Sequence, residues 1–167
     1  MSHAASPEEQ PDVYRIAHAA TGVAALRIGA GAVGLLAALV AGAEPRAAGI
    51  GLAFGFGASV VALVSNNRWS FYDRPPVDEL AHARVRRAVL VEGIRRALLP
   101  STAGVMVFLL ASLLVEPILS AALAGILGGM GAVGLASLVD VLVWERRESI
   151  RLYADLARPA RRYGSAR

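Results

Sequence analysis

Four long apolar blocks with almost no charge constrain this chain more than any other feature of its sequence. A hydrocarbon core about 30 Å thick is crossed by a helix of roughly 20 apolar residues. Unpaired backbone groups are costly in lipid, so helices are the economical structure for blocks of this length. The predicted spans are Gly22–Ala43, Ala47–Ser65, Ala97–Val115 and Ile118–Val143.

Short polar turns join these spans in pairs, one turn around Glu44–Arg46 and the other at Glu116–Pro117. The sequence therefore predicts an all-α polytopic membrane protein whose four transmembrane helices form two antiparallel hairpins. The chain divides into an N-terminal cytoplasmic or interfacial segment, two hairpins separated by an Arg-rich cytoplasmic connection, and a basic cytoplasmic tail. In order, these segments are 1–21, 22–65, 66–96, 97–143 and 144–167.

The arginines predict how the spans are oriented. All 17 basic residues are arginines. Arg46 lies in the first turn and Arg27 near the start of the first span, whereas the other fifteen flank the hairpins. Short loops rich in basic residues stay in the cytoplasm, so both termini and the middle connection are expected there. The absence of lysine is typical of a GC-rich bacterial genome, which suggests the bacterial inner membrane.

The polar segments are also expected to be helical. A helix start at Ser6 predicts a weakly amphipathic lead-in to the first span. A second polar helix, beginning at Asp78, is expected to run into the third span, with a kink at Pro100. The fourth helix should continue into the cytoplasm until Pro159, and residues 160–167 should be loose.

Small residues recur at helical spacing in the second and fourth spans. Gly51, Gly55 and Ser59 are four residues apart from one another, and Gly125 and Gly129 repeat the first step. Such ridges let two helices approach closely. We therefore expect these residues to pack helices together, either within the bundle or between copies of the protein.

The two hairpins also resemble each other in sequence. Leu35–Pro45 aligns with Leu109–Pro117, and in each case a glycine-rich block and then a tryptophan follow, Trp69 or Trp144. The hypothesis of a parallel internal repeat follows from this alignment. Chance similarity between Ala-, Gly- and Leu-rich helices is the alternative.

Enzyme chemistry finds little support in the sequence. His3, His18 and His82 are scattered, and the chain has neither cysteine nor lysine. No spacing typical of a metal site or a nucleophile with its base is present. We therefore expect no enzyme activity, no metal and no cofactor.

Two charged residues within the predicted spans are candidates for a functional role. Asp140 lies about one turn from the cytoplasmic end of the fourth span, where it could act in a relay or pair with Arg146 or Arg147. Arg27 is expected to extend its side chain to the membrane surface, with a lipid phosphate as the alternative partner.

A basic cluster in the middle connection is expected at the membrane surface. Attraction to anionic lipids is its simplest role; docking of a lipid-linked phosphate or an acidic partner is the alternative. Glu92 and Arg96 are spaced to form an ion pair on one helix face. Nucleic acid is not expected, because no aromatic residues alternate with these arginines. The cluster comprises Arg84, Arg86, Arg87, Arg95 and Arg96.

Aromatic and basic residues also close the second and fourth spans. Residues of these types anchor helices at a membrane interface. The predicted anchors are Arg68, Trp69, Tyr72 and Trp144. The run Asn66–Phe71, through Asn67, Arg68, Trp69 and Phe71, with four short spans in two hairpins, resembles the GtrA-like family of small membrane proteins. This resemblance implies a role in moving polyprenyl-linked sugars or in helping the glycosyltransferases that use them.

The expected function is that of a non-enzymatic membrane protein of the transport class, or of an accessory subunit that packs through its glycine-rich helices. One alternative is an assembly protein that recruits a cytoplasmic partner through its arginines. Another, implied by the resemblance, is an accessory to the translocation of polyprenyl-linked glycans. The expected partners are anionic membrane lipids and either further copies of the chain or another membrane protein.

Overall fold

The computed structural model describes residues 12–66, 77–79, 84–85, 87–99, 101–155 and 162–166. Its helices are α1 (Ile16–Val40), α2 (Pro45–Asn66), α3 (Arg87–Leu98), α4 (Ser101–Val115) and α5 (Pro117–Arg147). Its strands are β1 (Asp12–Arg15), β2 (Val77–Glu79), β3 (Arg84–Val85), β4 (Ile150–Asp155) and β5 (Arg162–Ala166). The described protein is mostly helical, as predicted, but it also contains a sheet that the sequence did not lead us to expect.

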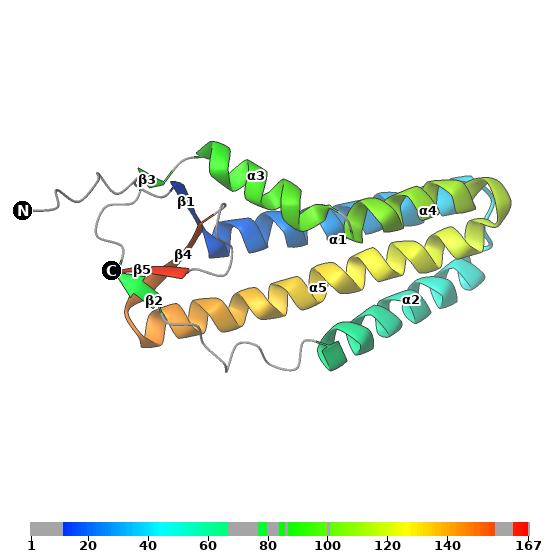
Figure 1. The fold of residues 1–167 in the computed structure, drawn as a ribbon. Coiled ribbons are helices and arrows are strands. Elements are labelled where there is room, and N and C mark those ends of the chain that lie inside the picture. Colours follow the sequence, from blue (N-terminus) through cyan, green and yellow to red (C-terminus); the bar gives the residue numbers. More distant parts are fainter. Residues whose placement is uncertain are drawn as a thin grey trace, which may run out of the picture.

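Helix α5 is the centre of the bundle. It packs along both α1 and α2, whereas these two helices touch each other little; Figure 1 shows α5 running between them. The turns are as short as predicted, with residues 41–44 joining α1 to α2 and Glu116 alone joining α4 to α5. The two helices of the first predicted hairpin therefore lie on either side of the last helix of the chain.

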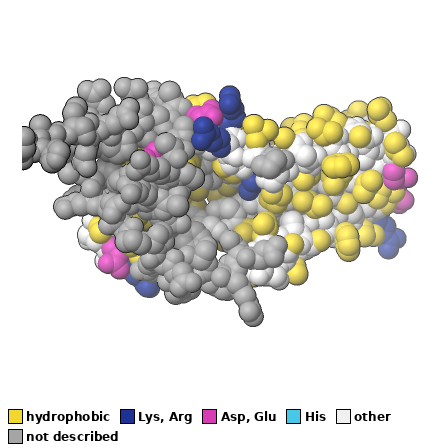
Figure 2. Space-filling model, in the orientation of Figure 1, with side chains coloured by type: hydrophobic (Ala, Val, Ile, Leu, Met, Phe, Trp, Pro, Cys, Tyr) yellow, Lys and Arg dark blue, Asp and Glu magenta, His cyan; other side chains and the backbone are white. Residues whose placement is uncertain are grey.

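Three helices, α1, α2 and α5, are long and apolar enough to cross a membrane. Helices α3 and α4 together supply a fourth crossing if this bent pair counts as one span. Large apolar side chains such as Val40, Phe54 and Leu114 are exposed on the outside of the bundle. Figure 2 shows this apolar surface over the helices, with charged side chains at the right-hand end of the view and beside the grey region. These features fit a multi-pass membrane protein.

The third predicted span differs from expectation. We predicted one helix from Asp78 onward, but Asp78 lies in β2, residues 84–85 form β3, and α3 begins only at Arg87. Helices α3 and α4 then meet at an angle of 53°. A proline lacks the N–H that a continuous helix needs, and the bend coincides with Pro100 in the sequence, although that residue lies outside the described ones.

The strands form one mixed sheet in the order β2-β5-β4-β1-β3. β4 pairs antiparallel with β1 and β5, while β3 pairs parallel with β1, and β2 pairs parallel with β5. Figure 1 shows the sheet at one end of the bundle, opposite the turns that join α1 to α2 and α4 to α5. The first and last described strands therefore lie at the same end of the molecule.

Predictions for both ends of the chain were partly wrong. Residues 16–21 are helical as expected, and α5 does extend beyond Val143, but strands replace other parts of the predicted structure. Residues 12–15 of the expected lead-in helix form β1, and residues 6–11 lie outside the described part. The tail helix does not reach Pro159, because α5 ends at Arg147 and Ser149 has a positive φ of 55°. Ile150–Asp155 then alternates apolar and polar residues, which is the period of a strand. Residues 162–166, which we expected to be loose, form β5.

The two halves of the chain are not alike in structure. α1 is a single helix of 25 residues, whereas its counterpart α4 has 15 residues and follows a bend. α5 lies at the centre of the bundle and its counterpart α2 at the side. The internal repeat stays a prediction from the sequence alone.

Candidate functional site

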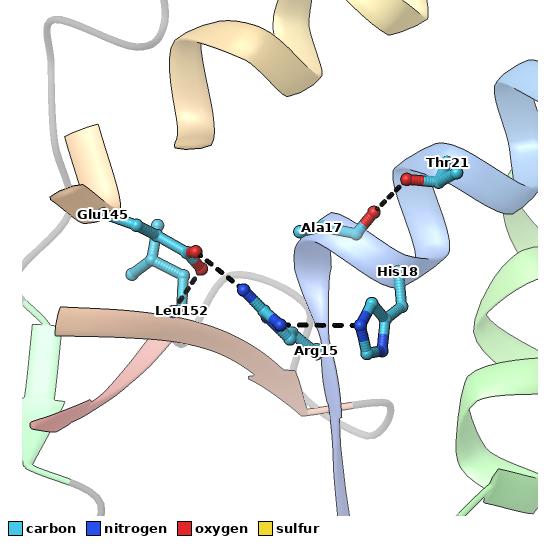
Figure 3. Close-up of polar contacts among 6 residues, drawn as sticks. All are labelled: Arg15, Ala17, His18, Thr21, Glu145 and Leu152. Carbon is cyan, nitrogen blue, oxygen red and sulfur yellow. Dashed lines mark hydrogen bonds and ion pairs between the residues drawn. The ribbon is translucent and has the colours of Figure 1, made fainter. Parts of the chain in front are cut away.

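A buried ion pair joins the sheet to the helical bundle. Glu145, in the last turn of α5, has no exposed surface. Its Oε2 accepts a hydrogen bond from Arg15 Nη2 at 3.1 Å, and its Oε1 accepts one from the backbone N–H of Leu152 at 2.9 Å. Figure 3 shows both contacts converging on the carboxylate. A buried charge is tolerated when it is paired and hydrogen-bonded, as here.

The backbone connections explain why these residues meet. Arg15 is the last residue of β1 and directly precedes α1, so it stands where the sheet meets the bundle. β4 follows α5 after a two-residue turn and pairs with β1, with Arg15 opposite Tyr153. The pairing of β1 with β4 thereby brings Arg15 to Glu145, although they lie 130 residues apart in the chain.

The rest of the Arg15 side chain is less completely bonded. Its Nη1 lies 3.5 Å from His18 Nε2, at the limit of a hydrogen bond (Figure 3). Its Nε is buried and has no hydrogen-bond partner among the described residues. The guanidinium is thus held mainly by Glu145, and the pair is suited to fixing two elements together rather than to acid–base chemistry.

Tyr14 packs β1 against α3. A Cβ added at Gly93 would lie 2.9 Å from Tyr14 Cζ, so the ring lies directly on the α3 backbone. Burial raises the pKa of the Tyr14 phenol above its ordinary value of 10.0, and the positive charge of Arg96 partly opposes this. Successive residues of a strand point to opposite faces, so Tyr14 and Arg15 connect β1 to α3 and to α5.

A second polar cluster lies at the bend between α3 and α4. Arg27, on α1, donates from Nε to Thr102 Oγ1 at 2.9 Å. Its Nη2 donates to Ser101 Oγ at 3.2 Å and to the carbonyl oxygen of Ala97 at 3.4 Å. Where a helix is interrupted, neighbouring side chains can satisfy the freed backbone groups. Arg27 therefore does more than extend to the membrane surface, the role we expected for it.

Two buried serines form a third polar contact, near the turn between α4 and α5. Ser112 Oγ and Ser120 Oγ are 2.7 Å apart. Both hydroxyls also lie within hydrogen-bond distance of the carbonyl oxygen of Leu109, at 2.8 and 3.3 Å. Hydrogen bonds between helices satisfy polar groups that lipid cannot, so this contact fastens α4 to α5.

The glycines singled out in the sequence lie between α2 and α5. A Cβ at Gly55 would collide with the Ala122 backbone, and one at Gly125 with the Leu52 carbonyl. A Cβ at Gly129 would collide with Ser59 Oγ, and Gly51 is also close to α5, with 3.1 Å to the carbonyl oxygen of Ile118. These small residues are thus used within the chain, where they let the two backbones approach.

The face of α5 that packs against α1 is built in the same way. A Cβ at Gly31 would lie 2.7 Å from the carbonyl oxygen of Ala124, and one at Gly131 would lie 2.6 Å from Ile28 Cγ1. These two glycines were not predicted as packing residues, because neither belongs to a series of small residues spaced four apart. The signal that could have identified them is the high glycine content of α5, with glycines on the face toward α1 as well as on the face toward α2.

The remaining candidates are dispersed. Asp140 is exposed on α5 and forms no ion pair with Arg146, Arg147 or any other described residue. The Glu92–Arg96 pair predicted on α3 is confirmed at 3.1 Å, and Arg95 joins the same carboxylate at 3.2 Å.

Trp144, a predicted interfacial anchor, is half-buried in α5. Other predicted site residues have side chains that the structure does not describe. Arg84 and Arg87 belong to β3 and α3, but their side chains are outside the description. Further candidates lie wholly outside the described residues, namely Arg68, Trp69, Tyr72 and Arg86, as do Asn67 and Phe71 of the GtrA-like run.

Apart from Arg27, the residues that build the polar clusters were not singled out from the sequence. Glu145 lies in the run Trp144–Arg147 next to two arginines, and this local sequence is typical of an exposed surface carboxylate. Thr102 and Ser101 read as part of an apolar span. The described residues contain no group of three or more His, Asp or Glu side chains that could hold a metal ion.

Fold and site together describe a multi-pass helical membrane protein with a small sheet fixed to one end of the bundle. No protein-family model, no curated protein and no solved structure matches this chain. The resemblance to the GtrA-like family therefore rests on the sequence run named above.

Proposed function

We propose that this chain is a non-enzymatic membrane protein that acts as an accessory subunit of a larger membrane complex and presents its sheet to a partner. The observation that carries this proposal is the Arg15–Glu145 ion pair. It fixes the sheet to the central helix, so the sheet has a defined position at the membrane surface. A rigid sheet outside the membrane is a suitable docking platform, because its outer strands offer backbone hydrogen bonds to another chain.

The packing of the bundle favours this role over transport. Backbone meets backbone where Gly55 and Gly125 lie between α2 and α5, and where Gly31 lies between α1 and α5. Helices at such distances leave no space for a solute between them at these levels. These close contacts all involve α5, the central helix. A transport path through the bundle would have to run along α5.

The proposed location is the bacterial inner membrane with both termini in the cytoplasm. The sheet end carries most of the described arginines, while the described residues of the opposite turns carry Glu44, Arg46 and Glu116. Under the positive-inside rule, this distribution supports a cytoplasmic position for the sheet. A cytoplasmic partner, or the cytoplasmic part of a membrane protein, would meet the sheet there.

Single cysteines test the accessory role against transport, because the natural chain has none. Ala121→Cys and Ala124→Cys replace residues of α5 with no exposed surface. We expect both to resist a water-soluble maleimide in native membranes and to react after denaturation. Reaction in native membranes would contradict the accessory role and favour transport.

Two further cysteines serve as matched controls for topology. Ala41→Cys, exposed in the turn between α1 and α2, should react in intact cells. Arg151→Cys, exposed on β4, should react only after the cells are permeabilised. The reverse pattern would show that the sheet lies outside the cell.

Photo-cross-linking tests the partner directly. A photoreactive residue in place of Arg151, on the sheet, should link to one defined partner protein. The same residue in place of Arg46, at the opposite end, should not give that product. The absence of a cross-link from the sheet would contradict the proposed docking role.

A further inference from the structure

The Arg27 cluster lies at the flank of the bundle rather than in its interior. Arg27 itself is half-exposed, and both Ser101 and Ala97 are exposed. Thr102 is the buried member, at 8% exposure. A guanidinium that served only to fasten helices together would be expected to face inward. This one is open to whatever surrounds the bundle.

Hydrogen-bond donors in the cluster remain unused. Arg27 Nε and Nη2 donate to three acceptors, but Nη1 donates to none of the described residues. Ser101 Oγ accepts from Nη2, so the hydroxyl proton of Ser101 is also free to donate, and no described residue receives it. Two donors, one of them charged, thus stand side by side on the open side of the bend.

The position along α1 places these donors near the boundary between hydrocarbon and headgroups. Arg27 is about 8 Å along the axis from Gly22, where the predicted first span begins, at 1.5 Å per residue. Side chains of a helix lean toward its N-terminus, which here is the sheet end. The neighbouring α3 carries Arg95 and Arg96, whose side chains are exposed. Exposed charges are far less costly among polar headgroups than in hydrocarbon. An acceptor at this level would be a lipid phosphate.

We propose that the bend between α3 and α4 is a binding site for the phosphate of one phospholipid. Arg27 Nη1 and the Ser101 hydroxyl are the donors, and Thr102 and the Ala97 carbonyl hold the guanidinium in place. Arginine suits phosphate because its charged N–H groups make short, strong hydrogen bonds to phosphate oxygens. The acyl chains lie along the apolar outer surface of the bundle. The site is independent of the proposed accessory role.

Native mass spectrometry of the purified protein with added phosphatidylglycerol tests this site. The wild type should retain one tightly bound phosphatidylglycerol. Arg27→Gln keeps a polar side chain but loses the charge and Nη1, and its affinity for the lipid should fall at least about tenfold. The matched control Arg46→Gln makes the same charge change at the opposite end and should bind as the wild type does. Equal binding by Arg27→Gln and the wild type would overturn the proposal.

Ser101→Ala is a second variant that tests the same site if Arg27→Gln fails to fold. It removes one phosphate donor but preserves the bonds from Arg27 to Thr102 and Ala97, so the fold should persist. Its affinity should fall several-fold, and unchanged binding would overturn the site.

Competition identifies the ligand. Diacylglycerol, which lacks the phosphate, should not displace the bound phosphatidylglycerol, and neither should inorganic phosphate at millimolar concentration. Displacement by diacylglycerol would show that the acyl chains alone determine binding, and displacement by inorganic phosphate would show an anion site instead of a lipid site. Either result would overturn the proposal.

Discussion

Arg15 and Glu145 form an ion pair at 3.1 Å, although one stands at the start of α1 and the other at the end of α5. The Arg15 side chain keeps 23% of its surface exposed, whereas Glu145 has none. The same carboxylate accepts the backbone N–H of Leu152, so one buried side chain ties together α5, β1 and β4. This contact therefore helps to fix the position of the sheet relative to the bundle.

Removing the charge of Glu145 should loosen the sheet without unfolding the spans. In Glu145→Gln the Arg15 guanidinium loses its ion-pair partner, and breaking a buried pair costs about 3 kcal/mol. We expect faster hydrogen exchange of the backbone amides of β1 and β4, with little change in the centre of α5. Hydrogen–deuterium exchange followed by mass spectrometry measures this.

The control for that variant is Asp140→Asn, which removes an exposed carboxylate of the same helix that forms no ion pair with the described residues. Its exchange should match that of the wild type. Arg15→Gln combined with Glu145→Gln should cost less than the sum of the single variants, because the two residues interact directly. Additive effects would show that the pair does not couple the sheet to the bundle.

Gly125→Ala should destabilise the packing of α2 on α5. The added Cβ meets the carbonyl group of Leu52, which is backbone and cannot move aside cheaply. Overpacking of this kind costs about 1–3 kcal/mol. The free energy of unfolding in a detergent titration measures the loss. Gly57→Ala is the matched control, since nothing lies within 4 Å of a Cβ there and stability should not fall.

Tyr14 should titrate above the ordinary range for tyrosine. Burial raises the pKa of its phenol above 10.0, so the folded state holds this proton more firmly than the unfolded state does. Its contribution to stability is therefore fully present below about pH 10 and is lost as pH rises through the folded pKa. Absorbance titration near 295 nm should show one late-titrating tyrosine that is missing in Tyr14→Phe.

Arg96 supplies a sensitive check on that assignment. Its positive charge lowers the Tyr14 pKa in part, so Arg96→Gln should move the titration of Tyr14 to still higher pH. A shift to lower pH would show that the charge of Arg96 does not act on the phenol.

Ser112 and Ser120 should contribute jointly to the contact between α4 and α5. Ser112→Ala or Ser120→Ala removes a buried hydrogen bond, at a cost of about 1 kcal/mol. The double variant should lose less than the two single losses combined, as measured by unfolding in detergent. The control is Ser137→Ala. Ser137 lies on α5 without a hydrogen bond to the described residues, so this change should leave stability unchanged. If the stability losses of Ser112→Ala and Ser120→Ala were fully additive, the two serines would not act as a pair.

Several residues show why part of the site was predictable. Gly55 and Gly125 could be singled out because the spacing of small residues within one helix is a local pattern. The Glu92–Arg96 pair is local in the same way, since its members are four residues apart. Arg27 could be recognised as unusual in an apolar block, but its acceptors lie 70 to 75 residues away and no local pattern points to them.

The sequence alone determined that the chain forms long apolar helices with short turns, because the length of an uncharged block decides whether it can cross a membrane. Only the tertiary structure decided that α5 lies between α1 and α2, that Arg27 meets the bend, and that the ends form a sheet. The strand pairings and the Arg15–Glu145 ion pair join residues far apart in the chain, so their energy depends on the whole fold. Glu145 shows this most directly, since its burial is favourable only where β1 and β4 meet.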